Sequence, residues 1–204
     1  MTRRIITFIT PTPPDISAFG VRALSAWLKQ KEHTVRCIFL PGGIEQLTHS
    51  GTFQYEYPPD IVRDILNITG GSDVVAFSFL SQYRDRAVQL TRAVKDHGDA
   101  FVVWGGIHPE VDPADGLNHA DAVCICEGEP VLEQLLETLD TPDALSGIPG
   151  LLTRSSPELP APAALPCIDD LDSLPWMDMG PDGHYVLDPP AGRIVPMTAE
   201  MLHR

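Results

Sequence analysis

Five short apolar runs are spaced along the first 140 residues, and between them apolar residues recur with helical spacing. Runs that are this short and apolar at successive positions are typical of strands buried on both faces of a parallel sheet. The expected strands cover residues 5–10, 34–40, 74–79, 101–104 and 121–126. The expected helices cover residues 17–31, 60–69 and 130–139, a stretch with Ala87, Leu90 and Val94 on one face, and a short helical turn at 112–119.

This alternation of strands and helices predicts a doubly wound α/β domain with a five-stranded parallel sheet. Among such sheets we choose the flavodoxin-like (Rossmann-like) strand order 2-1-3-4-5. Ligands bind at the carboxyl ends of the strands in open α/β sheets. The turns after the third and fourth strands, at residues 78–80 and 105–106, are therefore expected to form a binding rim.

The character of the chain changes after about residue 140. Residues 148–153 predict one more strand at an edge, and residues 156–204 are dense in proline and acidic residues. A segment of that composition does not form a core of its own. We therefore divide the chain into an α/β domain, residues 1–140, and an edge strand with an extended linker, residues 141–204.

Composition narrows the partners and the compartment. The chain of 204 residues has a formal net charge of -14 and no cluster of lysine and arginine, which argues against nucleic acid. No stretch is long enough to span a membrane, and the apolar run at residues 5–10 is too short for a signal peptide. Cys37, Cys124, Cys126 and Cys167 form no CxxC zinc pattern, so we expect reduced thiols, a cytoplasmic protein and no metal site.

The expected rim offers small and hydroxyl-bearing residues rather than a set of acids and bases. Gly105 and Gly106 let a bulky ligand approach the backbone, because neither has a Cβ atom, and Ser78 and Ser81 supply hydroxyl groups. The sequence contains no GxGxxG, GxxxxGK[ST] or GxSxG motif. Dinucleotide, nucleoside triphosphate and serine hydrolase sites therefore lack their usual signatures.

Three titratable residues near the rim leave the chemistry open. Glu127 and Glu129 are the nearest approach to a carboxylate pair, but alternate positions at the start of a loop do not ensure that the two converge. His108 follows the glycine pair and either faces a ligand or is a loop histidine satisfied by its neighbours.

Several short motifs stand in a fixed order along the chain. They are DISAFG at residues 15–20, Ser-x-Leu at 78–80, GGIHP at 105–109, D-x-V-x-x-x-E-G-E at 121–129, IPGL at 148–151 and I-x-D-L-D-x-L-P at 168–175. In this order and spacing they resemble the N-terminal cobalamin-binding domain of cobalamin-dependent radical S-adenosylmethionine (radical SAM) enzymes. The resemblance covers almost the whole chain.

The resemblance implies cobalamin as the cofactor and a set of residues that bind it, without a catalytic residue. These are Asp15, Ser17, Gly20, Ser78, Leu80, Ser81, Gly105, Gly106, His108, Glu127, Gly128 and Glu129. Ser17 stands where related domains have the histidine that binds cobalt, and a hydroxyl is a poor cobalt ligand. The resemblance therefore implies base-off binding without a protein histidine, with the nucleotide tail passing Ser78 and the glycine pair.

The cluster motif of radical SAM enzymes, CxxxCxxC, is absent from this sequence. S-adenosylmethionine and a 4Fe–4S cluster are therefore expected only in a missing catalytic domain, joined in cis or present as a partner chain. The chain is then part of a radical SAM enzyme of methyltransferase type, or a free-standing binder, and no turnover is expected from it alone.

Two other functions stay open. A cofactor-free binding or regulatory module that retains the fold would fit Ser17 and the long loop expected at residues 44–59. A stand-alone enzyme would use Glu127, Glu129 and His108, with a substrate that the sequence does not identify.

Overall fold

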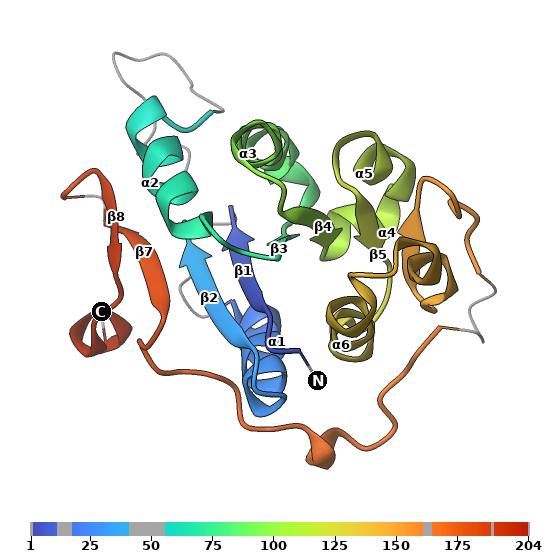
Figure 1. Ribbon diagram of the computed structural model, residues 1–204. Helices are drawn as coiled ribbons and strands as arrows, with labels where there is room; N and C mark the ends of the chain where they lie inside the picture. The colour runs from blue at the N-terminus through green and yellow to red at the C-terminus, as the bar shows by residue number, and fades with distance from the viewer. Residues whose placement is uncertain (1, 12–17, 41–55, 161–164, 189, 204) are drawn as a thin grey trace.

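A twisted sheet passes through the centre of the molecule (Figure 1). The computed structural model describes residues 2–11, 18–40, 56–160, 165–188 and 190–203. In these residues the sheet has eight strands in the order β6-β5-β4-β3-β1-β2-β7-β8. The strands are β1 (Ile5–Thr10), β2 (Thr34–Phe39), β3 (Val74–Ser78), β4 (Phe101–Gly105), β5 (Ala122–Cys124), β6 (Leu151–Thr153), β7 (His184–Asp188) and β8 (Arg193–Pro196).

Helices cover both faces of the sheet (Figure 1). The helices are α1 (Phe19–Gln30), α2 (Pro59–Thr69), α3 (Arg84–His97), α4 (Ile107–Val111), α5 (Pro113–His119) and α6 (Gly128–Thr138). Helices α1 and α6 bury Leu28 and Leu135 on one face, while α2 and α3 bury Ile65 and Leu90 on the other. The strands alternate between the two cores, as the side chains of a β-strand must.

The predicted strand order is confirmed. Strands β2, β1, β3, β4 and β5 are neighbours in that order, and each pair among them is parallel. The first strand has the predicted bounds, and the helix predicted from residue 17 begins at Phe19, next to residues 12–17, which lie outside the described part. Helix α4, which directly follows the glycine pair, was not predicted.

The sheet has more strands than the five that were predicted for its parallel part. β6 forms within the predicted edge strand and runs antiparallel to β5. β7 adds to β2 in parallel, and β8 returns antiparallel to β7, although both lie in the stretch predicted to be an extended linker. The reason is local, since His184 and Val186 point into the α1 core while Tyr185 packs on the other face. The average composition of residues 156–204 hides this short alternation.

Residues 165–183, which we name the strap, connect the two ends of the sheet. Figure 1 shows the strap passing along the side of α6 and α1 on its way to β7. Near its start, the amide of Ile168 donates a hydrogen bond of 2.6 Å to Glu127. No helix in the described ranges is both long and apolar enough to cross a bilayer.

Trp104 links β4 to α3 in the core. Its side chain is fully buried, and its indole N–H donates to the Thr91 hydroxyl at 2.8 Å. The Phe79 ring packs edge to face against the indole, with ring centroids 4.9 Å apart. The His119 ring stacks on the indole with centroids 5.5 Å apart. The hydroxyl of Thr91 is thus the polar anchor of the largest buried side chain.

We expect Thr91→Val to lower the free energy of unfolding by about 1–3 kcal/mol, because it leaves the buried indole N–H without an acceptor while conserving volume. Urea denaturation measures the loss. The matched control is Thr138→Val, which removes an exposed hydroxyl bonded to the Gln134 carbonyl and should change stability by no more than about 0.5 kcal/mol. Equal losses of stability in the two variants would contradict the role of the Thr91 hydroxyl as the acceptor for the Trp104 indole.

Candidate functional site

A cavity of about 200 Å³ opens at the carboxyl ends of β3, β4 and β5, beneath α1 and α6. Its apolar wall comes from strand residues that face these helices and from the helices themselves: Phe8, Leu24, Ala76, Val103 and Leu132. Phe77, whose side chain packs in the core of the opposite face, also borders the cavity. Small and polar residues complete the lining: Gly20, Ser78, Gly105, Gly106, Cys124, Cys126, Gly128 and Glu129. The site is therefore an apolar pocket with a few polar groups, which is the usual build of a small-molecule site.

Glycines leave the space in which the cavity lies. A Cβ atom at Gly105 would make only ordinary contact, 3.8 Å from Cys124 Cβ, and one at Gly20 would meet nothing within 4 Å. At Gly128 a Cβ atom would lie 2.9 Å from Leu24 Cδ2. Gly105 and Gly20 thus keep the cavity open, whereas Gly128 permits the close approach of α1 and α6.

Gly106 has a different role, which is to turn the chain into α4. Its φ is +89°, a conformation that side chains rarely adopt. A Cβ atom there would lie 2.9 Å from the amide nitrogen of Phe79 and 3.1 Å from Ser78 Oγ. The amide of His108 then donates to the Phe79 carbonyl at 3.3 Å, which fixes the start of α4 against the end of β3.

His108 points away from the cavity into a polar network between α3 and α5. Its Nε2 atom donates to Asp115 at 3.1 Å, and its Nδ1 atom pairs with the Ser81 hydroxyl at 3.2 Å. Arg84 donates twice to Asp115, at 2.6 and 2.7 Å. These bonds from Arg84 outweigh burial and lower the pKa of Asp115 to about 2. Both ring nitrogens of His108 are therefore engaged.

Two cysteines lie at the cavity and support its floor. Cys124 donates to the Cys126 carbonyl at 3.5 Å, and the contact with Cys126 together with burial raises the pKa of the Cys124 thiol. A Cβ atom at Gly150 would overlap Cys126 Sγ, at 2.1 Å, and Gly150 has a φ of +83°. The glycine of the IPGL motif therefore makes room for the Cys126 side chain.

The two acidic residues of the EGE motif face different neighbours. Glu127 accepts the strap amide of Ile168, whereas Glu129 lines the cavity. Burial raises the pKa of Glu129 above its ordinary value. The pair therefore divides between fixing the strap and supplying a polar group to the cavity.

The structure brings half of the predicted binding residues together. The cavity is lined by Gly20, Ser78, Gly105, Gly106, Gly128 and Glu129. The residues of the prediction that are described but do not line it are Leu80, Ser81, His108 and Glu127. Asp15 and Ser17 lie outside the described residues. Sequence reasoning missed the apolar wall, because residues such as Phe8 and Leu24 have the same pattern as any core position.

The model of the B12 binding domain family matches residues 7–136, which is more than half of the chain and includes all of the cavity lining. The chain belongs to the B12-binding domain family. In this B12-binding domain, the cavity lies at the carboxyl edge of the sheet. The family resemblance inferred from the motifs is confirmed.

Solved structures agree with this B12-binding domain in fold. The cobalamin-dependent S-adenosylmethionine radical enzyme OxsB, with aqua-cobalamin bound, superposes with a TM-score of 0.63 at 15% identity over 86% of this chain. The radical S-adenosylmethionine methyltransferase TsrM from Kitasatospora setae, with cobalamin and a [4Fe-4S] cluster bound, gives 0.55 at 17% identity over 74%. The chain spans only 24% of OxsB and 27% of TsrM. No curated protein sequence matches it.

We expect Gly106→Ala to lower the free energy of unfolding by at least about 2 kcal/mol, because a Cβ atom there is strained in φ and collides with the Phe79 backbone. Gly105→Ala is the adjacent control, and its cost should stay below about 1 kcal/mol since only ordinary contacts await its Cβ atom. Chemical denaturation of both variants measures the difference. If the two glycines tolerated alanine equally, the assigned role of Gly106 would be wrong.

Proposed function

We propose that this chain binds cobalamin at the carboxyl edge of the sheet, with the nucleotide tail in the cavity and the corrin ring at its mouth. The cavity itself carries the proposal: its apolar walls fit a flat aromatic base such as benzimidazole, and its glycine rim lets a bulky ring approach the backbone. A volume of about 200 Å³ has no room for a corrin macrocycle. The ring would therefore remain outside.

Exposed apolar residues flank the mouth and suit the underside of a macrocycle. Phe19 precedes Gly20 of the cavity and is 59% exposed, while Ile107 follows Gly106 and is 56% exposed. Large apolar side chains left in solvent beside a pocket are typical of ligand sites. Glu129 adds a carboxyl group to the lining, and its burial raises its pKa above the ordinary value.

We infer base-off binding without a protein histidine ligand. A nucleotide base that occupies the cavity is not available to the cobalt ion, and His108 is engaged by Asp115 and Ser81 on the far side of the glycine turn. When bound, cobalamin would supply organometallic chemistry such as methyl transfer. The residues of this chain would bind the tail, support the ring and shield the apolar base from water.

We also infer that the domain serves a radical SAM enzyme of methyltransferase type. A catalytic domain with the CxxxCxxC cluster motif, joined in cis or present as a partner chain, would supply S-adenosylmethionine and the 4Fe–4S cluster. The domain organisation of residues 1–140 as the cobalamin domain, with the rest leading to the catalytic part, belongs to this proposal. The four free cysteines fit a cytoplasmic protein. This chain alone is expected to show no turnover.

An ultraviolet–visible titration with methylcobalamin and hydroxocobalamin tests the proposed function. We expect a shift to the base-off spectrum and retention of cobalamin through gel filtration. Gly105→Val should weaken binding by at least about tenfold, because its side chain would occupy the cavity while the backbone tolerates it. Gly98→Val is the control, since Gly98 ends α3 at the opposite edge of the sheet and a Cβ atom there meets nothing within 4 Å.

If the unmodified chain retained no cobalamin, the proposed function would fail for this chain, and a cofactor-free module would take its place. If Gly98→Val weakened binding as much as Gly105→Val, the cavity would not be the site of the tail.

Alkylation of Cys126 provides an independent test. This thiol is half-buried at the cavity, whereas Cys37 and Cys124 are buried and Cys167 is exposed. In a Cys167→Ser background, we expect methylcobalamin to slow the alkylation of Cys126 by iodoacetamide several-fold. Cobinamide, which lacks the nucleotide tail, should protect less. Peptide mass spectrometry follows the modification, and equal protection by both corrinoids would contradict a tail in the cavity.

A further inference from the structure

One carboxylate joins the strap to α1 and β7. Asp178 Oδ2 accepts hydrogen bonds from Ser25 Oγ at 2.6 Å, Lys29 Nζ at 2.6 Å and His184 Nε2 at 2.8 Å. His184 is buried, and its Nδ1 atom has no partner in the described residues, so Asp178 alone holds this ring by hydrogen bonding there. The three donors come from two elements that are far apart in sequence.

Backbone groups reinforce the same junction. The amide of Asp178 donates to the Arg22 carbonyl at 3.1 Å, and Arg22 Nη1 donates to the Asp178 carbonyl at 2.6 Å. The guanidinium of Arg22 is fully buried and lies over the Phe39 ring of β2 at 4.6 Å. The strap, α1 and strand β2 are therefore joined through Asp178 and Arg22.

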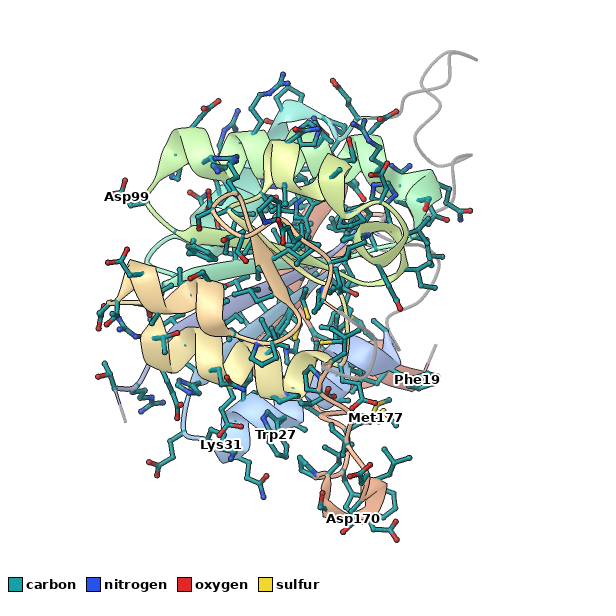
Figure 2. The ribbon with its side chains drawn as sticks, turned by 90° about the vertical axis from the view of Figure 1, so that its right-hand side faces the viewer. Phe19, Trp27, Lys31, Asp99, Asp170 and Met177 are labelled. Atoms are coloured by element: carbon teal, nitrogen blue, oxygen red, sulfur yellow. The ribbon has the colours of Figure 1, made fainter. Side chains whose placement is uncertain are left out.

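Apolar packing does little to hold this part of the strap. Trp176 is 96% exposed, and Met177 and Met179, on either side of Asp178, are 42% and 46% exposed. Figure 2 shows Met177 on the strap and Phe19 on α1 at the same end of the molecule. Since a large part of these apolar side chains remains in water, the attachment rests mainly on polar contacts. Asp178 makes most of them, and the Gly180 and Asp182 carbonyls add bonds from Arg22 and Lys29.

The helix that Asp178 holds forms one wall of the cavity. Gly20 and Leu24 of α1 line it, and on its other flank Trp27 Nε1 donates to Glu133 of α6 at 3.0 Å. Helix α1 is therefore fixed on one side by α6 and on the other by the strap. Its position decides how far Leu24 reaches over the cavity.

We propose that Asp178 is a positioning residue for the cobalamin cavity, because it holds α1 at the distance from α6 that the nucleotide tail requires. This inference rests on the proposed function. Loss of the carboxylate charge would weaken the bond that holds His184 and leave the Asp182 carbonyl as the stronger acceptor for Lys29, which is costly for partly buried donors. The strap would then be held to α1 mainly by its backbone contacts with Arg22 and Lys29, and α1 would be fixed less firmly on that side.

The protonation state of Asp178 agrees with this arrangement. Burial opposes ionisation, but the hydrogen bonds from His184, Lys29 and Ser25 prevail and hold the pKa of Asp178 well below its usual range. The carboxylate is therefore charged at neutral pH, and charge-assisted hydrogen bonds are the stronger kind.

The chain offers a closely matched control in Asp64. This buried carboxylate of α2 also accepts three hydrogen bonds from the C-terminal part, two from Arg193 at 2.6 Å and one from the amide of Ile194 at 3.1 Å. It fixes β8 to α2 on the opposite face of the sheet, and it does not line the cavity. Asp64→Asn and Asp178→Asn thus remove comparable junctions, but only the second acts on α1.

The experiment compares the cobalamin and cobinamide affinities of the unmodified chain, Asp178→Asn and Asp64→Asn. Each protein is measured at a temperature well below the midpoint of its thermal unfolding. We expect Asp178→Asn to weaken cobalamin binding by about tenfold, within the range for residues that act through packed neighbours. Its effect on cobinamide should be smaller, since that ligand has no tail. Asp64→Asn should lower stability but leave the cobalamin affinity unchanged.

Hydrogen exchange of the ligand-free chain supplies a readout that does not need cobalamin. Asp178→Asn should speed exchange in α1 and in the strap, whereas Asp64→Asn should speed it in α2 and β8. If Asp178→Asn does not fold, Ser25→Ala removes one donor and should cause a smaller loss of affinity in the same direction.

The outcomes separate the two proposals. If the unmodified chain binds cobalamin and Asp178→Asn binds it equally well, the positioning role is overturned while the proposed function stands. Equal losses for Asp178→Asn and Asp64→Asn would reduce Asp178 to a residue of general stability. If the unmodified chain does not bind cobalamin, the proposed function and the positioning role fail together.

Discussion

Helices α1 and α6 approach each other at Gly128, and the cavity depends on that contact. Any side chain larger than hydrogen at this position would press on Leu24, because a Cβ atom would lie 2.9 Å from its Cδ2. The two helices thus close over the sheet, while small residues beneath them, such as Ala76 and Gly105, keep the space from filling. The pocket therefore exists because these positions lack large side chains, on a sheet that is otherwise densely packed.

The two faces of the sheet edge have separate tasks. The face under α1 and α6 carries the cavity, and the face under α3 and α5 carries the network of Arg84, Asp115 and His108. The glycine pair lies between them: Gly105 opens toward the cavity, and Gly106 turns the chain so that His108 reaches the network. A rigid polar network behind the turn fixes the rim without placing charges in the pocket.

Local patterns were sufficient for the central sheet and for part of the site. Apolar runs such as residues 74–79 are buried on both faces, so their period and length identify them as strands. Gly105 and Gly106 were recognisable because they end such a run. The cavity wall was not recognisable, since Phe8 and Leu24 would look the same in a filled core. Contacts such as Asp178 with Ser25 join residues about 150 positions apart, and no local pattern records them.

The parallel pairing of β7 with β2 has a consequence for how the molecule is made. Cys37 lies beside His184, so this edge of the sheet cannot form until the residues of β7 have left the ribosome. Helix α1 is synthesised early, but its partner at Asp178 arrives late. During synthesis the nascent chain can therefore assemble β1, β2 and β3 while the wall of the pocket still lacks its outer support. Such long-range closure slows folding, and the pocket gains its outer support only after β7 has been synthesised.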